Sequence, residues 1–474
     1  MQPTWVRRTL CMWACLAPAA MLFLPARALG ATPAHGMVGA VPSLAEGIPF
    51  AGLLASMALG PMFAPRLWHR WSRFMLLGWS LTLLLAEGLA FGPDVAAVSL
   101  RNAMLEEYLP FITLLLALYT AAGGIVVSGG PWGRPAGNTA LLAFGTLLGG
   151  VIGTTAAAMV LIHLLLRANA HRSRKSHLVV FFIVLVANAG GALSPIGNPP
   201  LYVGFLAGVP FLWPLGRLAG PLLVLAVPLL AGFYLVDRWL AAGEPPAPRR
   251  QRFRLRGVAN LGLLVAVALS TAALGIWQSG SVSLLGARVK IGLLASIALC
   301  VGASVASAVA TPRAVRRRNM FSWAPMVEVA ELFASIFITI GPVLAMLRAG
   351  AAGPLSGVFG LLANAAGEPI PAAYFWFSGL FSAFLDNAPT YLVFFGLAGN
   401  DVSLLTGPMV RTLAAISMGS VFFGGLTYIG SAPNLLICAI AAHRGVRMPG
   451  FFGYCGIATL VLAVPLLLVT WVVF

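Results

Sequence analysis

The stretch that decides the fold is Leu193-Ser194-Pro195-Ile196-Gly197-Asn198-Pro199-Pro200, which interrupts a long apolar run. A second stretch of the same design, Leu426-Thr427-Tyr428-Ile429-Gly430-Ser431-Ala432-Pro433-Asn434, follows in the other half of the chain. Proline lacks an amide donor and clashes with the preceding turn, and glycine tolerates an opened backbone, so neither stretch can continue a helix. In a bilayer such breaks persist only where protein or a water-filled cavity satisfies the freed backbone groups. Matching breaks in two halves of an apolar chain are typical of the binding site of a secondary transporter.

The composition is that of a membrane protein. Of the 474 residues, 60% are hydrophobic and 9% are charged, and the mean hydropathy is +0.94. Soluble domains average about 45–50% apolar and about 25% charged residues. Apolar runs of about 20 residues, enough to cross a hydrocarbon core of about 30 Å, recur from Ile48 to Val473. We therefore expect an all-α polytopic integral membrane protein, with the lipid bilayer as its surroundings.

The net charge of +17 lies mainly in short arginine-containing loops between apolar runs. This placement is typical of orientation signals and argues against a nucleic-acid partner. Near the N-terminus, Arg7 and Arg8 precede an apolar run, and Ala28-Leu29-Gly30 offers a cleavage site. Residues 1–30 are therefore predicted to be a signal peptide, with an uncleaved signal anchor as the alternative. Cleavage would leave the N-terminus outside a bacterial-type cytoplasmic (inner) membrane.

Two further apolar segments are predicted to be re-entrant hairpins, entering and leaving on one side of the membrane. They are Gly137 to Arg167, interrupted by Gly149-Gly150-Val151-Ile152-Gly153-Thr154-Thr155, and Pro371 to Ala398. With both as hairpins, 20 Lys and Arg residues lie inside and six outside, which satisfies the positive-inside rule. The alternative, in which each hairpin arm crosses fully, is not excluded by the hydropathy pattern.

This topology divides the chain into two repeats of opposite orientation, each with five transmembrane helices and one hairpin. The first repeat covers 45–240, a basic cytoplasmic linker covers 241–256, and the second repeat covers 257–474. Inverted repeats with broken helices at the midplane are typical of alternating-access transport.

The hairpin tips correspond to each other as the broken spans do, since the offset that relates Gly197 to Gly430 also relates Thr154 to Asn387. We therefore expect four non-helical points to meet near the midplane. Helix N-termini there would favour an anion, and carbonyl ends would favour a small cation. The candidate binding residues are Thr154, Thr155, Ser194, Gly197, Asn198, Asp386, Asn387, Thr390, Thr427, Gly430, Ser431 and Asn434.

Asp386 is the leading candidate for proton coupling, because a carboxylate inside the membrane is costly and by default functional. The alternative is that Asp386 only caps a helix at the hairpin turn. Glu87, which lies within a predicted span, is the second candidate, with a structural pairing as its alternative.

Sequence signatures of enzymes are missing. The chain contains no HExxH, GxSxG or Walker motif, and its acids, histidines and five cysteines are not spaced as metal ligands. We expect a transporter without a metal site or cofactor, with Na⁺ or H⁺ as coupling ions. A membrane-embedded enzyme or a channel is a remote alternative.

Three motifs resemble the ion transporter superfamily: Gly190-Gly191-x-x-Ser194-Pro195-Ile196-Gly197-Asn198-Pro199-Pro200, Ser382-Ala383-Phe384-Leu385-Asp386-Asn387-Ala388-Pro389-Thr390 and Gly424-Gly425-x-Thr427-x-Ile429-Gly430. The nearest branch is that of arsenite permeases and NhaD-type sodium–proton antiporters, with their citrate-transporter relatives. Glu328-Val329-Ala330-Glu331-Leu332-Phe333 is also similar to the start of a span in that branch.

The resemblance covers about 45 to 474 and implies two hairpins, broken spans, elevator-like alternating access and often a homodimer. One departure concerns Thr154-Thr155, where sodium-coupled relatives often place Asp-Asn or Ser-Asn-Thr. A single carboxylate still suits proton or single-sodium exchange. Our first expectation is Na⁺/H⁺ antiport, and the alternative is proton- or sodium-coupled transport of citrate or another small organic anion.

Overall fold

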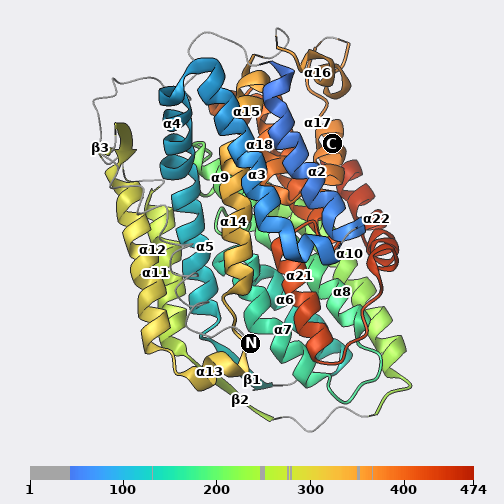
Figure 1. Ribbon diagram of the computed structural model, residues 1–474. Helices are drawn as coiled ribbons and strands as arrows, with labels where there is room; N and C mark the ends of the chain where they lie inside the picture. Colours follow the sequence, from blue (N-terminus) through green and yellow to red (C-terminus); the bar gives the residue numbers. More distant parts are fainter. Residues whose placement is uncertain are drawn as a thin grey trace. The chain divides into compact units, whose positions relative to one another are not determined.

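The computed structural model describes residues 43–63, 65–130, 132–245, 251–274, 277, 280–284, 286–349, 353–365 and 367–474. Within these ranges the chain is mainly helical, with four short strands (Figure 1). Seven of the described helices are long and apolar enough to cross a membrane. The count is eight if α14 (Ala324–Thr339) and α15 (Gly341–Arg348), which are bent by 41°, form one span. The predicted fold class, an all-α polytopic membrane protein, is confirmed, while the predicted signal peptide lies outside the described residues.

The chain packs as two compact units. Unit 1 lies within residues 1–116, 273–301 and 322–359, and unit 2 within 117–272, 302–321 and 360–474. Each unit draws on both halves of the sequence, so this division reflects packing rather than repeats. The two inverted repeats, 45–240 and 257–474, stay a prediction.

In unit 1, α3 packs on α2, α4 and α14. The core includes Phe111, whose ring centroid lies 4.4 Å from that of Phe333 and 5.6 Å from that of Phe337. Besides α14 and α15, the elements are η2 (Leu44–Gly47), α2 (Ile48–Phe63), α3 (Pro65–Phe91), α4 (Pro93–Asn102), η3 (Ala103–Tyr108), the start of α5 (Leu109–Ala122), β3 (Ser281–Leu284), β4 (Ala287–Lys290), the first part of α12 (Ile291–Ala310) and most of α16 (Ser356–Leu362).

Unit 2 contains the rest of α5, α12 and α16 and the remaining elements, including all but the last two residues of α11. They are β1 (Val126–Gly130), α6 (Pro135–Ile152), α7 (Thr154–Ala168), α8 (Ser176–Leu185), η4 (Ala189–Leu193), α9 (Pro199–Leu206), α10 (Trp213–Ala241), β2 (Gln251–Arg256), α11 (Val258–Leu274), α13 (Arg313–Arg318), α17 (Pro371–Phe384), α18 (Asn387–Leu397), α19 (Val402–Thr406), α20 (Val410–Phe422), η6 (Phe423–Gly425), α21 (Ala432–His443) and α22 (Phe451–Val473). Strand β2, which falls at the end of the predicted linker, pairs antiparallel with β1, with Val126 opposite Arg256.

All four predicted interruptions of helices are confirmed. Helices α6 and α7 are separated by Gly153, whose φ of 88° is readily adopted by glycine. The chain is also interrupted between α17 and α18, between α8 and α9, and between α20 and α21. Within unit 2, α6 and α7 lie in the lower part of the view in Figure 1, and α17 and α18 in the upper part. Re-entry of the hairpins into one side of a membrane stays a prediction.

Accessibility to an impermeant thiol reagent tests this topology. Arg174→Cys, Arg252→Cys and Asp401→Cys place single cysteines at exposed positions in a variant whose native cysteines are replaced. In intact cells we expect labelling at 401 and protection at 174 and 252, because the latter two belong to predicted cytoplasmic loops. Permeabilised cells provide the control, since all three sites should then react. Labelling at 174 in intact cells would mean that the first hairpin crosses the membrane.

Candidate functional site

The first hairpin tip and the first broken span are joined by hydrogen bonds within unit 2. The Thr154 amide donates to the Gly197 carbonyl at 2.9 Å, and the Ser194 hydroxyl donates to the Gly150 carbonyl. The same hydroxyl accepts from the Gly197 amide at 3.2 Å. Ser194 therefore satisfies backbone groups that the broken helices leave free, as the interior of a membrane protein requires.

The second half of the chain repeats these bonds. The Thr427 hydroxyl donates to the Ala383 carbonyl and accepts from the Gly430 amide at 2.9 Å. Thr427, Ala383 and Gly430 follow their counterparts Ser194, Gly150 and Gly197 at one constant offset in the sequence. The sequence correspondence that suggested a repeat is thus matched by equivalent hydrogen bonds.

Two amide–amide bonds connect the halves. Asn387 Nδ2, at the second hairpin tip, donates to Asn198 Oδ1 in the first broken span at 2.7 Å. Asn188 Nδ2 donates to Asn434 Oδ1 in the second broken span at 2.9 Å. The four non-helical points predicted from the sequence therefore form one buried cluster in unit 2. We call it the four-break cluster.

Gly430 shows how closely the backbone packs in the four-break cluster. A Cβ atom at this position would lie 2.7 Å from the Gly424 carbonyl oxygen and 2.9 Å from the Ala383 carbonyl oxygen. Both contacts are too short for carbon. The glycine noted in the sequence is thus required by the approach of a hairpin to a broken span, and a side chain would force them apart.

Asp386 is the acid of the four-break cluster, and 6% of its surface is exposed. Its Oδ1 accepts from the Ala388 amide at 3.3 Å, while its backbone carbonyl accepts from the Thr390 hydroxyl at 2.9 Å. Among the described residues, no Lys, Arg or His forms an ion pair with Asp386. The carboxyl group therefore caps α18, and it is also available to a proton or a cation.

Four helices begin at the cluster: α7, α9, α18 and α21. The first turn of a helix carries unpaired amide groups and a partial positive charge. Four such ends beside amide and hydroxyl groups make an environment that favours an anion. Asp386, asparagine oxygens and backbone carbonyls provide hard oxygen ligands for a small cation in the same cluster.

The other predicted site residues divide between the units. Thr155 follows Thr154 in the first turn of α7, and Ser431 is buried immediately before α21. Glu87, in contrast, belongs to α3 in unit 1, where it is 3% exposed and its Oε2 has no hydrogen-bond partner in the described part of the chain. Glu87 and Asp386 therefore belong to different packing units.

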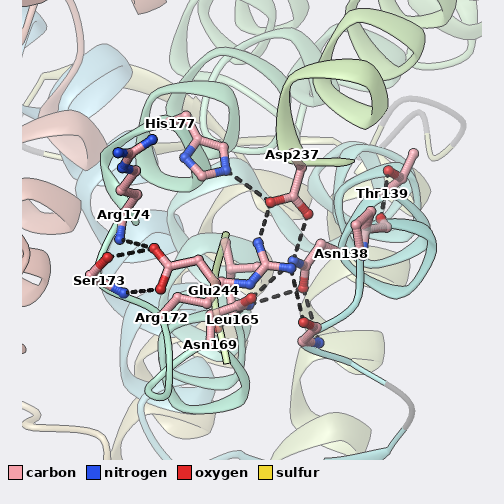
Figure 2. A network of polar contacts seen from close by, with 12 residues as sticks. Asn138, Thr139, Leu165, Asn169, Arg172, Ser173, Arg174, His177, Asp237 and Glu244 are labelled. Carbon is pink, nitrogen blue, oxygen red and sulfur yellow. Dashed lines mark hydrogen bonds and ion pairs between the residues drawn. The ribbon is translucent and has the colours of Figure 1, made fainter. Parts of the chain in front are cut away.

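Sequence reasoning missed Asn188, which is fully buried and bonded to Asn434. The available signal was an asparagine inside an apolar run, two residues before Gly190-Gly191. It also missed a charged network at the base of the first hairpin (Figure 2). We call this second group the hairpin-base network, and define it by Asn138, Asn169, Arg172, His177 and Asp237.

In the hairpin-base network, Arg172 and Asp237 form a buried ion pair. Asp237 also accepts from Asn138 Nδ2 at 2.9 Å and lies 2.9 Å from His177 Nε2. Asn138 and Asn169 exchange two side-chain hydrogen bonds of 3.0 and 2.9 Å (Figure 2). Because Asn138 is on α6 and Asn169 follows α7, these bonds join the two arms of the hairpin to each other and to α10.

The carboxylate of Glu244, which is not part of the hairpin-base network, is bonded to the two residues that follow Arg172. Glu244 accepts hydrogen bonds from the Ser173 hydroxyl, the Ser173 amide at 2.8 Å and the Arg174 amide at 2.9 Å (Figure 2). These bonds lower the pKa of the Glu244 carboxyl from its ordinary value of 4.5 to about 2. The carboxylate thereby holds the turn after α7 against the end of α10.

This pKa shift predicts a pH-dependent effect of Glu244→Gln. A carboxyl with a lowered pKa in the folded state stabilises that state above pH 4.5, and the contribution disappears as the pH falls through about 2. We expect the variant to have a lower unfolding temperature in detergent above pH 4.5. The difference from wild type should shrink as the pH falls towards 2. A pH-independent difference would contradict a role for the charge.

Comparison with known proteins gives one family. A family model described as "Putative citrate transport" matches residues 40–474, which include the four-break cluster and the hairpin-base network. No curated protein matches the chain. The resemblance to citrate-transporter relatives is thus confirmed at the level of the family, and the arsenite-permease and NhaD-type branch stays a prediction.

Proposed function

The chain belongs to this citrate transport family, and on that premise we propose that it is a secondary active transporter of citrate or a similar small carboxylate. Transport is coupled to a cation, H⁺ or Na⁺, and proceeds by alternating access in the cytoplasmic membrane. The membrane-helical fold and the family match point to a transporter rather than an enzyme.

The observation that carries the proposal is the start of α7, α9, α18 and α21 at the four-break cluster. A carboxylate approaching these ends meets the partial positive charge of four helix N-termini. Hydroxyl and amide side chains, including those of Thr154, Asn198 and Asn387, provide further neutral donors. This set of groups recognises an anion without a permanently buried arginine or lysine.

Asp386 supplies the link between substrate and coupling ion. A negatively charged substrate is repelled by an ionised carboxylate, so Asp386 favours the substrate only when it carries a proton or a bound cation. Binding of the cation therefore precedes or accompanies binding of the anion. The two binding free energies are coupled, as symport requires.

Uptake of radiolabelled citrate into proteoliposomes tests the proposal. We expect accumulation when an inward proton or Na⁺ gradient is imposed, and none in liposomes lacking the protein. Unlabelled tricarboxylates or dicarboxylates should compete if the substrate is a small carboxylate. Absence of uptake under both gradients, with protein shown to be folded and inserted, would overturn the proposed substrate class.

Na⁺/H⁺ antiport is the second candidate, and the environment of Asp386 favours it. The carboxyl has no ion-pair partner among the described residues and lies beside amide and carbonyl oxygens, which suits exchange of a proton for a hard cation. Inside-out vesicles with a fluorescent pH indicator distinguish the candidates. Recovery of fluorescence on adding Na⁺ without citrate supports antiport, and recovery only in vesicles loaded with citrate supports proton-coupled symport.

A further inference from the structure

We infer that the side-chain oxygen of Asn188, together with the hydroxyl group of Ser420, binds a monovalent cation at a position separate from the Asp386 carboxyl. Only the role of this cation as the coupling ion of transport rests on the proposed function. It follows from two buried oxygen atoms in unit 2 that the described part of the protein leaves without partners.

The orientation of the Asn188 amide is fixed by its neighbours. Its nitrogen has two hydrogen atoms, and these are donated to the Ile183 carbonyl at 2.8 Å and to Asn434 Oδ1 at 2.9 Å. Flipping the amide, so that its oxygen and nitrogen exchange places, would set its oxygen against both acceptors. Oδ1 is therefore an acceptor in a defined position, fully buried and without a hydrogen-bond partner among the described residues.

Ser420 is the second unpartnered group. Its side chain is fully buried, and its hydroxyl oxygen has no hydrogen-bond partner within the described ranges. Asn188 Oδ1 lies so close to Gly424 that a Cβ there would be 2.5 Å away. Ser420 lies in the last turn of α20, and Gly424 lies in the 3-10 helix η6 that directly continues it. Since α20 also packs on η4, which begins beside Asn188, both oxygens belong to the same region.

The chemistry of these oxygens selects the ligand. An amide oxygen that only accepts hydrogen bonds repels an anion, whereas amide and hydroxyl oxygens are ligands for hard cations. The backbone carbonyl of Ser420 accepts from the Ser382 hydroxyl at 2.7 Å, and Asp386 follows Ser382 by four residues. The cation would be bound between a residue of the first broken span and a residue of α20, in the part of α20 that is bonded to α17.

Thermal unfolding of the purified full-length protein in detergent tests this site without any substrate. We expect NaCl to raise the unfolding temperature of the wild type more than choline chloride at equal ionic strength. Ser420→Ala should raise the Na⁺ concentration for half of this effect by about tenfold or more, as loss of a cation ligand does. Because the Ser420 hydroxyl has no partner in the described part of the protein, this change removes no hydrogen bond seen there.

The controls separate binding from folding. Ser420→Thr restores a hydroxyl and should recover the Na⁺ response. Ser378→Ala, which removes a buried hydroxyl bonded within its own helix, should respond to Na⁺ as the wild type does. Asn188→Ala should weaken the response like Ser420→Ala, but it also removes two hydrogen bonds, so Ser420→Ala is the decisive variant.

A wild type without a Na⁺-specific response, or a Ser420→Ala variant with an unchanged one, would overturn the inference. Citrate uptake measured in the same preparations keeps this outcome apart from the proposed function. Intact Na⁺ binding without citrate uptake would overturn the substrate and leave the cation site standing. Citrate uptake together with an unaltered Na⁺ response in Ser420→Ala would overturn the cation site and leave the proposed substrate standing.

Discussion

Asp386→Asn is expected to abolish transport while the protein inserts and folds. An amide keeps the size of the side chain and an oxygen that can accept from the Ala388 amide, so the cap on α18 survives. It cannot bind and release a proton near neutral pH, and it carries no charge to attract a cation. Uptake or exchange in proteoliposomes and the unfolding temperature in detergent measure the two properties separately.

Asp401 provides a matched control. It caps α19 through hydrogen bonds from the Ser403 amide at 2.8 Å and the Leu404 amide at 3.1 Å, but its side chain is exposed. Asp401→Asn should therefore transport like the wild type. Asp386→Glu keeps a carboxyl in altered geometry, and we expect partial activity with a shifted pH profile. Normal transport by Asp386→Asn between about pH 6 and about pH 9 would mean that Asp386 serves only as a helix cap. Glu87 would then be the leading candidate for proton coupling.

The helix interruptions were predictable because their cause is local. Glycine and proline in Leu193 to Pro200 prevent a helix whatever surrounds them, and the same holds for the second stretch. The constant spacing between the paired motifs then predicted which interruptions correspond. The Ser194 and Thr427 hydroxyls donate to equivalent carbonyls, while the inverted repeats themselves stay a prediction. Strand β2 also had a local signal, since Arg252 to Arg256 alternates polar and apolar residues.

The partners of buried polar groups were not predictable. Asn138 and Asp237 are 99 residues apart and share no periodic pattern, so nothing in the sequence pairs them. Arg172 appeared as one of several loop arginines, although the fold buries it against Asp237. Hydropathy reports the average surroundings of a segment. It does not identify which charged side chain in that segment is buried in an ion pair.

The hairpin-base network supports the second large expected effect. Asp237→Asn leaves the Arg172 guanidinium buried without its counter-charge, and removing one partner of a buried ion pair typically costs about 3–5 kcal/mol. The substitution also replaces an acceptor used by Asn138 with a group that can donate. We expect a correspondingly lower free energy of unfolding, measured by titration with SDS in mixed micelles.

Two comparisons show whether the charge is responsible. In Arg172→Gln/Asp237→Asn both charges are absent, so a substantial part of the lost stability should return. Arg174→Gln changes an exposed arginine two residues away and should alter the free energy of unfolding by less than about 0.5 kcal/mol. If the double variant were as unstable as the sum of its single variants, Arg172 and Asp237 would contribute independently. The loss would then come from separate hydrogen bonds, such as those to Asn138 and Gly133, and not from an uncompensated charge.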